Sequence, residues 1–309
     1  MDRKLVVSSS PHLKSPEDIQ SIMVDVMVAL FPAALMGVFL FGYQALITIV
    51  LAMVAAMATE AIIMRKGFFG DGSAALTGML LALVLPPAPP WWITVIGSVV
   101  AIAIGKHLFG GIGNNIFNPA LVGRAVLVVS WGAHIAGDVW LQPQPFGFTA
   151  DLVTQASPLA TYDASLLDLF IGTVPGCIGE TSALALIIGG LWLLYRGHIE
   201  WRIPGVFIAI VFIMGLFDGG FEMGLYHVLA GGALLGAIFM ATDMVTSPVT
   251  PMGRIIFGFG CGFITMIIRM FGGYPEGVMF AILFMNSVTP LIDNLTVPKK
   301  FGEVKQSDA

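Results

Sequence analysis

Ten apolar segments follow one another along the chain and constrain its fold more than any other feature of the sequence. A straight helix needs about 20 apolar residues to cross a hydrocarbon core of roughly 30 Å, because each residue adds about 1.5 Å. Several segments approach that length, whereas 73–85 is too short to cross as a straight helix. We place the segments at residues 22–41, 43–64, 73–85, 91–107, 117–131, 168–195, 203–217, 224–242, 255–271 and 277–292. The sequence therefore predicts an all-α polytopic membrane protein.

Composition supports this class and restricts the cofactors. The chain is 57% hydrophobic and 11% charged, which a soluble domain with a solvated surface does not reach. Its two cysteines, Cys177 and Cys261, are far apart and lack iron–sulfur or haem-attachment spacing. We expect any redox cofactor to be held without thiolates, membrane lipid to surround the chain, and no nucleic acid to be a partner.

A polar interruption at about 137–163 separates two strongly hydrophobic halves. If the N-terminus is cytoplasmic, every Lys and Arg except Arg269 falls on the inner side, a strong positive-inside bias. No Lys or Arg lies between Arg124 and Arg196, whereas this stretch contains Asp138, Asp151, Asp163 and Asp168. We expect a multi-pass protein of the cytoplasmic (inner) membrane, with both termini cytoplasmic and the central loop outside.

The two halves resemble each other. Gly-Asp-Gly-Ser at 70–73 resembles Gly-Glu-Thr-Ser at 179–182, and Asn-Pro followed by Gly-Arg at 118–124 resembles Ser-Pro followed by Gly-Arg at 247–254. An odd number of spans per repeat inverts the second copy. We therefore predict about ten transmembrane helices in two inverted five-helix repeats. The predicted divisions are a cytoplasmic segment 1–21, a first repeat 22–136, an extracytoplasmic loop 137–167, a second repeat 168–293 and a cytoplasmic tail 294–309.

Acidic residues inside apolar segments are costly and therefore candidates for function. They are Asp25, Glu60, Asp243 and Asp293, each within a few residues of an expected helix end. For any one of them an interfacial position is the favoured interpretation, and Asp243 is the first to test for ion coupling. We expect no metal site, because no ligand-like spacing joins His107, His134 and His227.

Two polar motifs each allow a structural and a functional interpretation. In the central loop, Asp151-x-x-Thr154-x-Ala156-Ser157 surrounds Ser157 with small residues that leave its hydroxyl accessible for modification, although the motif is equally an ordinary turn. The amides of Asn115 and Asn118 suit a neutral heterocycle, and Asn118 before a proline is also an ordinary helix cap.

Together these motifs resemble a known family. They are Ser-Ser-Ser-Pro-His at 8–12, Gly-Asn-Asn-Ile-Phe-Asn-Pro-Ala at 113–120, the central loop, and Gly-Glu-Thr-Ser-Ala-Leu-Ala at 179–185. Over nearly its whole length the chain resembles RnfD, a membrane subunit of the Rnf ion-translocating ferredoxin:NAD⁺ oxidoreductase. It is more distantly similar to NqrB, a membrane subunit of the sodium-pumping NADH:quinone oxidoreductase.

This resemblance implies covalent FMN on the outer loop, esterified through its phosphate. The family motif resembles Asp-x-x-Ser/Thr-Gly-Ala-Thr with the flavin on the final Thr, so the matching residues are Asp151, Thr154 and the acceptor Ser157. The chain differs by Gln155 in place of Gly and by serine in place of the acceptor Thr. Thr154 and Thr161 are the alternative hydroxyls.

The resemblance to NqrB also implies a second, non-covalent flavin, a riboflavin, near the Asn115–Asn118 motif. Glu180, Thr181 and Ser182 either cap a buried half-helix or contact a flavin or an ion pathway.

Three functions compete at this point. The first is the electron-carrying flavoprotein subunit of an Rnf-type complex that moves Na⁺ or H⁺, with a flavin transferase, a second flavinylated subunit and iron–sulfur subunits as partners. The second is the role of NqrB in the sodium-pumping quinone reductase. The third is a flavin-free channel of the urea-transporter type, which also has five-plus-five inverted repeats. In each, the chain alone holds no complete set of catalytic residues.

The covalent flavin predicts a mass change. The peptide that spans residues 125–195 should carry an added mass equal to FMN less water, and fragmentation should place it on Ser157. An unmodified peptide from cells that contain the flavin transferase would contradict the attachment.

Overall fold

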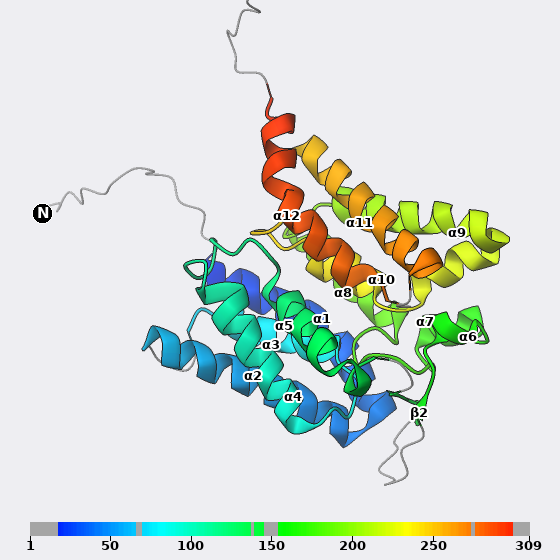
Figure 1. Cartoon of the computed structure of the whole chain (residues 1–309), viewed down its shortest axis with the longest axis horizontal. Coiled ribbons are helices and arrows are strands. Elements are labelled where there is room, and N and C mark those ends of the chain that lie inside the picture. The colour runs from blue at the N-terminus through cyan, green and yellow to red at the C-terminus, as the bar shows by residue number, and fades with distance from the viewer. Residues whose placement is uncertain (1–17, 66–69, 137–138, 145–153, 273–275, 299–309) are drawn as a thin grey trace, which may run out of the picture.

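The computed structural model describes residues 18–65, 70–136, 139–144, 154–272 and 276–298, and it is mostly helical there (Figure 1). In chain order the elements are α1 (Ile19–Phe41), α2 (Tyr43–Met64), α3 (Ser73–Leu83), α4 (Trp91–Val100), η1 (Ala101–His107), α5 (Pro119–Trp131), η2 (Gly132–His134), β1 (Trp140–Leu141), β2 (Thr154–Gln155), α6 (Pro158–Thr161), α7 (Leu166–Ile171), α8 (Ala183–Arg196), α9 (Arg202–Leu229), α10 (Ala233–Leu235), η3 (Gly236–Met240), α11 (Pro251–Phe271) and α12 (Val278–Thr296). The segments η1 and η3 are π-helical.

The helices form two groups that follow the two halves of the sequence. In the first, α2 packs against α3 and α4, and α5 packs against α4 and η1. In the second, α11 lies between α9 and α12. Figure 1 shows α1–α5 in blue to green on one side, and α9, α11 and α12 on the other. Contacts of α1 with α8 and of α5 with α12 join the groups.

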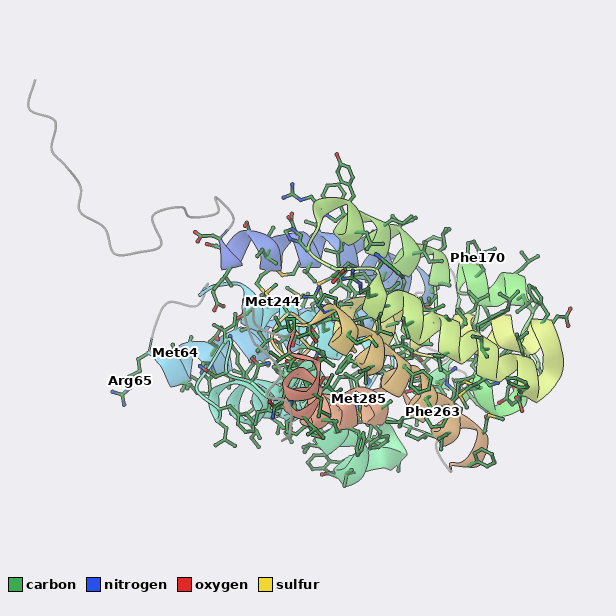
Figure 2. The ribbon with its side chains drawn as sticks, turned by 90° about the horizontal axis from the view of Figure 1, so that it is seen from above. Met64, Arg65, Phe170, Met244, Phe263 and Met285 are labelled. Carbon is green, nitrogen blue, oxygen red and sulfur yellow. The ribbon has the colours of Figure 1, made fainter. Side chains whose placement is uncertain are left out.

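Five helices in the described part of the chain are long and apolar enough to cross a membrane: α1, α2, α9, α11 and α12. Large apolar side chains project from the outside of these helices, as the sticks in Figure 2 show. Phe259 and Phe263, for example, stack on the outside of α11 with ring centroids 5.7 Å apart. In water such a surface would be unfavourable, and in lipid it is the expected one. The fold is that of a multi-pass membrane protein.

Glycines break the chain where the apolar pattern predicts helix ends. Gly42 separates α1 from α2 with φ +72°, a conformation that favours glycine. Gly220, with φ +82°, interrupts α9, so that the arms on either side fold back on each other. A Cβ on Gly215 would lie 2.8 Å from the Cα of Gly224 across this turn. The predicted segments 203–217 and 224–242 therefore lie on separate arms. The second segment is not one helix, because α9 ends at Leu229 and the chain continues as α10 and η3 only from Ala233.

Segment 168–195 differs from the structure, whereas segment 73–85 is short, as predicted. Segment 168–195 is not one helix: α7 ends at Ile171, and α8 starts only at Ala183. Between them Gly172, with φ +111°, turns the backbone away from the helical path. Segment 73–85 is the short helix α3, which has 11 residues, all of them buried. Neither α3 nor α8 is long enough to cross a bilayer alone; α3 is buried throughout, and α8 begins within the bundle.

The predicted outer loop is held at its base by a short antiparallel pair. Trp140 pairs with Gln155 and Leu141 with Thr154, and both residues of β1 are buried. Residues 145–153, which include Asp151, lie outside the described part of the chain. The pair fixes where the loop returns to the bundle, immediately before Ser157.

Close packing of α1 on α8 gives a stability prediction. A Cβ on Gly189 of α8 would collide with the carbonyl oxygen of Ala29 in α1. Gly189→Val should therefore lower the stability of the purified protein by about 1–3 kcal/mol, since a backbone oxygen cannot move aside as a side chain can. Thermal unfolding in detergent measures the loss. Gly132→Ala is the control, because nothing lies within 4 Å of the added atom; equal loss in both variants would contradict the packing argument.

Candidate functional site

Polar side chains cap the starts of four helices, and three of these helices, α3, α5 and α8, begin inside the bundle. The Asn118 side chain caps α5, which continues with Pro119, and the Thr250 hydroxyl caps α11, which continues with Pro251. Ser182 caps α8 by accepting the N–H of Ala185 at 3.4 Å. At the start of α3 the Asp71 carboxylate accepts the N–H of Ser73 at 3.0 Å. These caps satisfy backbone donors that lipid could not satisfy.

A cavity lies among several of these helix ends. Apolar residues from α1, α3 and α8 form much of its wall, and its polar groups come from α3, η1, the loop before α5, the loop after α8 and the loop after η3. The polar residues are Ser73, Thr77, Lys106, Asn115, Asn118, His198, Thr242 and Asp243. A mostly apolar hollow with a few convergent polar groups is the usual form of a cofactor site.

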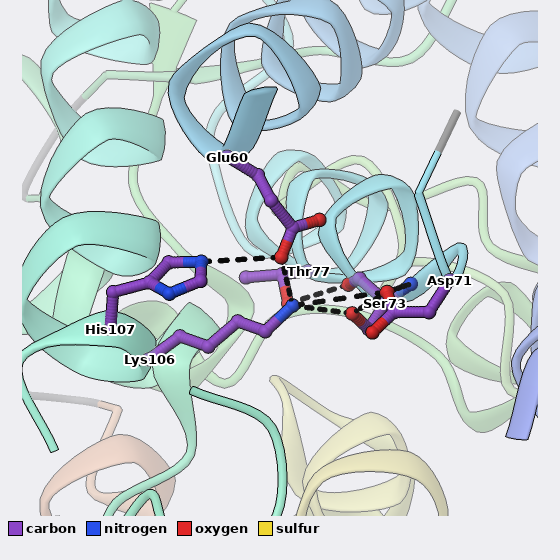
Figure 3. Close-up of polar contacts among 6 residues, drawn as sticks. All are labelled: Glu60, Asp71, Ser73, Thr77, Lys106 and His107. Atoms are coloured by element: carbon purple, nitrogen blue, oxygen red, sulfur yellow. Dashed lines mark hydrogen bonds and ion pairs between the residues drawn. The ribbon is translucent and has the colours of Figure 1, made fainter. Parts of the chain in front are cut away.

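Lys106 supplies the positive charge of this cavity (Figure 3). Its side chain is only 4% exposed, and its ammonium group donates to the Glu60 carboxylate of α2 and to the Ser73 hydroxyl of α3. Asp71 lies 3.9 Å from the same nitrogen, and His107 Nε2 lies 3.2 Å from Glu60 Oε1. Because a buried cation is stable only when it is paired, these contacts hold Lys106 at the cavity wall.

The two predicted asparagines have different roles in the structure. Asn118 uses both ends of its amide: its oxygen accepts the N–H of Ala120 at 3.1 Å, and its nitrogen donates to the Met240 carbonyl at 3.3 Å. The capping interpretation therefore holds for Asn118. Asn115 is buried at the cavity wall, where its nitrogen donates to the Phe117 carbonyl at 3.2 Å. It is the better candidate of the two for contact with a ligand.

A second polar cluster forms where α5, the start of α8 and the start of α12 meet. Arg124 on α5 is buried and pairs with Glu276, and its Nη2 lies 3.6 Å from Cys177 Sγ. Glu180 accepts the Cys177 N–H at 2.9 Å. Thr181 is buried with a hydroxyl that has no hydrogen-bond partner. Glu180 and Thr181 are thus polar interior residues, whereas Ser182 is a cap.

The predicted flavin acceptor lies at the start of α6. The Ser157 hydroxyl accepts the Leu159 N–H at 3.4 Å, and the residue is 5% exposed, in contrast to the accessible hydroxyl expected from its small neighbours. The hydroxyl of Tyr226 donates to the Pro158 carbonyl at 2.9 Å and holds α6 against α9. Thr154 and Thr161, the alternative acceptors, are exposed.

A hollow opens next to Ser157. Its wall comes from both chain neighbours of Ser157 and from the segments before and after α7, namely Gln155, Ala156, Pro158, Thr161, Asp163, Ala164, Asp168, Thr173, Val174 and Pro175. The loop therefore offers a partly polar surface directly beside the predicted attachment point.

The acidic residues predicted inside the spans all have partners. Asp25 pairs with Arg196 and His198, Glu60 with Lys106 and His107, Asp243 accepts from Thr246 at 3.2 Å, and Asp293 accepts the Val249 N–H at 3.0 Å. Asp243 alone of these four lines the cavity.

Three basic residues counted in the charge asymmetry are not loop charges. Lys106 and Arg124 are buried and ion-paired, and Arg269 is buried with its guanidinium donating to the carbonyls of His227 and Ala230 at the end of α9. They carry no information about which side of the membrane a loop occupies. The orientation rests on the remaining Lys and Arg residues.

The positions of Lys106 and Arg124 in the sequence could have indicated that these cations are buried. Lys106 ends an apolar segment and Arg124 lies within another, and a cation inside a membrane segment marks a functional or structural pairing. Within the described residues, Cys177, Glu180 and Glu276 also place one ligand atom each within 4.8 Å of one another, a set that could hold a metal ion. The absence of a metal stays a prediction.

Comparison with known proteins decides the family. The model of the NQR2, RnfD, RnfE family matches residues 6–302. The chain belongs to this family. It is 47% identical to the D-type subunit of the Na(+)-translocating ferredoxin:NAD(+) oxidoreductase complex of Acetobacterium woodii, over 97% of this chain and 96% of the relative. It is 46% identical to the D-type subunit of the proton-translocating ferredoxin:NAD(+) oxidoreductase complex of Clostridium ljungdahlii, over 96% of each.

A more distant relative agrees with this assignment. The chain is 35% identical to the D-type subunit of the ion-translocating oxidoreductase complex of Halorhodospira halophila, over 96% of this chain and 95% of the relative. The predicted resemblance to RnfD is confirmed.

The Lys106 contacts give a second stability prediction. Lys106→Met should lower stability by about 3–5 kcal/mol, because Glu60 would remain buried without its cation. The double variant with Glu60→Met should recover much of that loss, since neither charge is then unpaired. Thermal unfolding of the three variants in detergent measures the coupling. Additive losses would contradict a direct pairing of Lys106 with Glu60.

Proposed function

We propose that this chain is the membrane flavoprotein subunit of an Rnf-type complex, a ferredoxin:NAD⁺ oxidoreductase whose electron transfer drives Na⁺ or H⁺ across the membrane. The observation that carries the proposal is the near full-length similarity to the D-type subunits of two such complexes. One of these relatives is named for Na⁺ and the other for protons, at 47% and 46% identity, so similarity favours neither ion.

The subunit acts with partners. One flavin at the outer face cannot by itself take electrons from ferredoxin across a bilayer, so the complex must supply further carriers. We propose the other Rnf subunits for this role, including iron–sulfur subunits and a second flavinylated subunit, and a flavin transferase for the modification itself. The chain is then one part of an oxidoreductase and is not catalytically complete alone.

The proposed topology is a pair of inverted repeats in the cytoplasmic membrane of a bacterium or archaeon, with both termini cytoplasmic and the loop 137–167 outside. Several correspondences support the repeat. The helix α3 starts after Gly-Asp-Gly and α8 starts after Gly-Glu-Thr-Ser. The π-helical η1 precedes the capped, proline-containing start of α5, and the π-helical η3 precedes that of α11.

We propose FMN on Ser157, with its phosphate esterified to the side-chain oxygen. The hollow beside Ser157 supports this position, because a group attached to Ser157 could contact the residues that line the hollow. The cap on α6 is also compatible, since an ester oxygen keeps a lone pair for the Leu159 N–H. Asp151 and Thr154 belong to the proposed recognition motif.

We propose a second, non-covalent flavin, a riboflavin, in the cavity at Asn115. The lining residues suit such a group: apolar walls for the ring, the Asn115 amide for a polar edge, and the Lys106 ammonium for an edge that becomes negative on reduction. Bound there, a riboflavin would supply one- or two-electron transfer. Lys106 and Asn115 would bind and orient it, and the surrounding helices would exclude water.

In-gel fluorescence tests the covalent flavin. The denatured polypeptide, co-expressed with the flavin transferase, should fluoresce, and Ser157→Ala should abolish the signal and electron transfer while the complex still assembles. Ser165→Ala is the matched control, because Ser165 caps α7 as Ser157 caps α6.

The outcomes separate the alternatives. A signal that survives Ser157→Ala but is lost in Thr154→Ala or Thr161→Ala would move the attachment to that hydroxyl. No fluorescence in the unsubstituted protein would contradict covalent attachment. The amount of flavin that denaturation releases from the protein measures the second, non-covalent site separately. This released flavin should still be found in Ser157→Ala.

A further inference from the structure

Two carboxylates lie close together in the interior, between the halves of the molecule. Glu180 precedes α8, and Glu276 precedes α12. Together with the Cys177 thiol they place ligand atoms within 4.8 Å of one another. Like charges so close in a poorly solvated site repel strongly, so an unprotonated pair needs compensation from several donors.

The hydrogen bonds to Glu180 and Glu276 leave one oxygen of each carboxylate without a donor. Glu180 is 5% exposed, and its Oε1 accepts the Cys177 N–H while its Oε2 has no hydrogen-bond partner. Glu276 accepts from Arg124 through Oε2, and its Oε1 has no partner either. Each buried acceptor without a donor costs free energy. One bound proton removes the repulsion between the two charges, because one carboxyl group becomes neutral. It also supplies a missing donor, because the protonated oxygen of one carboxyl group can donate to the other.

Two guanidinium groups lie near the pair, and their hydrogen bonds go to Glu276 and to backbone carbonyls. Arg124 on α5 donates to Glu276, and Arg269 on α11 donates to the carbonyls of His227 and Ala230. In the part of the chain that the structure describes, no arginine donates a hydrogen bond to Glu180. Glu180 is therefore the carboxyl group better suited to be neutral, and Glu276 the one better suited to be ionised.

We propose that Glu180 and Glu276 form a buried proton-binding site. Glu180 carries one exchangeable proton and shares it with Glu276, directly or through one water molecule. When the proton leaves to solvent, both carboxylates are charged and no bond other than O–H is broken. This site is independent of either flavin.

A metal ion fits the same atoms less well. Arg124 already contacts two of the three groups, the Glu276 carboxylate and, at 3.6 Å, the Cys177 sulfur. A divalent cation would have to bind beside this fixed positive charge. A proton displaces no existing contact.

Protonation at this site bears on how the helices are held together. With Glu180 neutral, Arg124 has one charged acceptor, Glu276, and the contact ties α5 to the start of α12. Loss of the proton gives Arg124 a second charged acceptor at the start of α8. The proton therefore changes which elements the guanidinium joins, as a coupled ion carrier requires.

Infrared spectroscopy of the purified complex tests the site. A protonated carboxyl group has a carbonyl band that is separate from those of ionised carboxylates and shifts in deuterated water. We expect such a band at neutral pH, its loss as pH rises, and its loss in Glu180→Gln. Asp168→Asn is the control, because Asp168 is exposed, accepts from Ser165 and Thr173, and is ionised at neutral pH.

Glu180→Gln keeps the shape of a neutral carboxyl group, so the complex should assemble. An unchanged deuterium-sensitive band in that variant would overturn the proposal. If Glu180→Gln fails to assemble, Glu276→Gln decides: with its acceptor replaced by an amide and Arg124 released, Glu180 should ionise and the band should disappear. Persistence of the band in Glu276→Gln would equally overturn the proposal.

Discussion

The need to satisfy backbone hydrogen bonds away from water governs this structure more than any other constraint. A helix that ends inside lipid leaves N–H and C=O groups without partners, and each costs several kcal/mol by order of magnitude. The chain nevertheless ends helices inside the bundle, at α3, α5 and α8. It does so by closing each end with a side chain, such as Asn118 or Ser182, and by burying the ends against other helices. The cavity exists because these ends leave polar groups that face inward.

The same constraint explains the charged interior. Lys106 and Arg124 would be unfavourable in lipid, yet each lies at an interior helix end or within a short helix, where it meets a carboxylate from another element. These pairs add little net stability compared with apolar packing, but they fix which elements meet. In the first group Lys106 joins η1 to α2 and α3, and between the groups Arg124 joins α5 to the start of α12.

The sequence predicted features set by neighbouring residues, such as helices and caps, but it did not predict contacts between residues far apart in the chain. Apolar length located the long helices, the bounds of the apolar segments located the breaks that the structure places at Gly42 and Gly220, and the Asn118-Pro119 pair indicated a helix start. The contact of Lys106 with Glu60 spans 46 positions, and that of Arg124 with Glu276 spans 152. No periodicity in one sequence reports such pairs. The segment 168–195 was misjudged for a related reason, since hydropathy does not register a polar turn composed of small residues.

The two contacts of the Asn118 side chain restrict which insertions and deletions this chain can accept during evolution. Its amide closes α5 and at the same moment holds the Met240 carbonyl, 122 positions away, where η3 ends. Insertion of one residue before Pro119 would rotate α5 by about 100° relative to that carbonyl, because a helix has 3.6 residues per turn. The linker from η1 to α5 should therefore tolerate substitution far better than any change of length, and length should be the slowest-changing property of this segment among related chains.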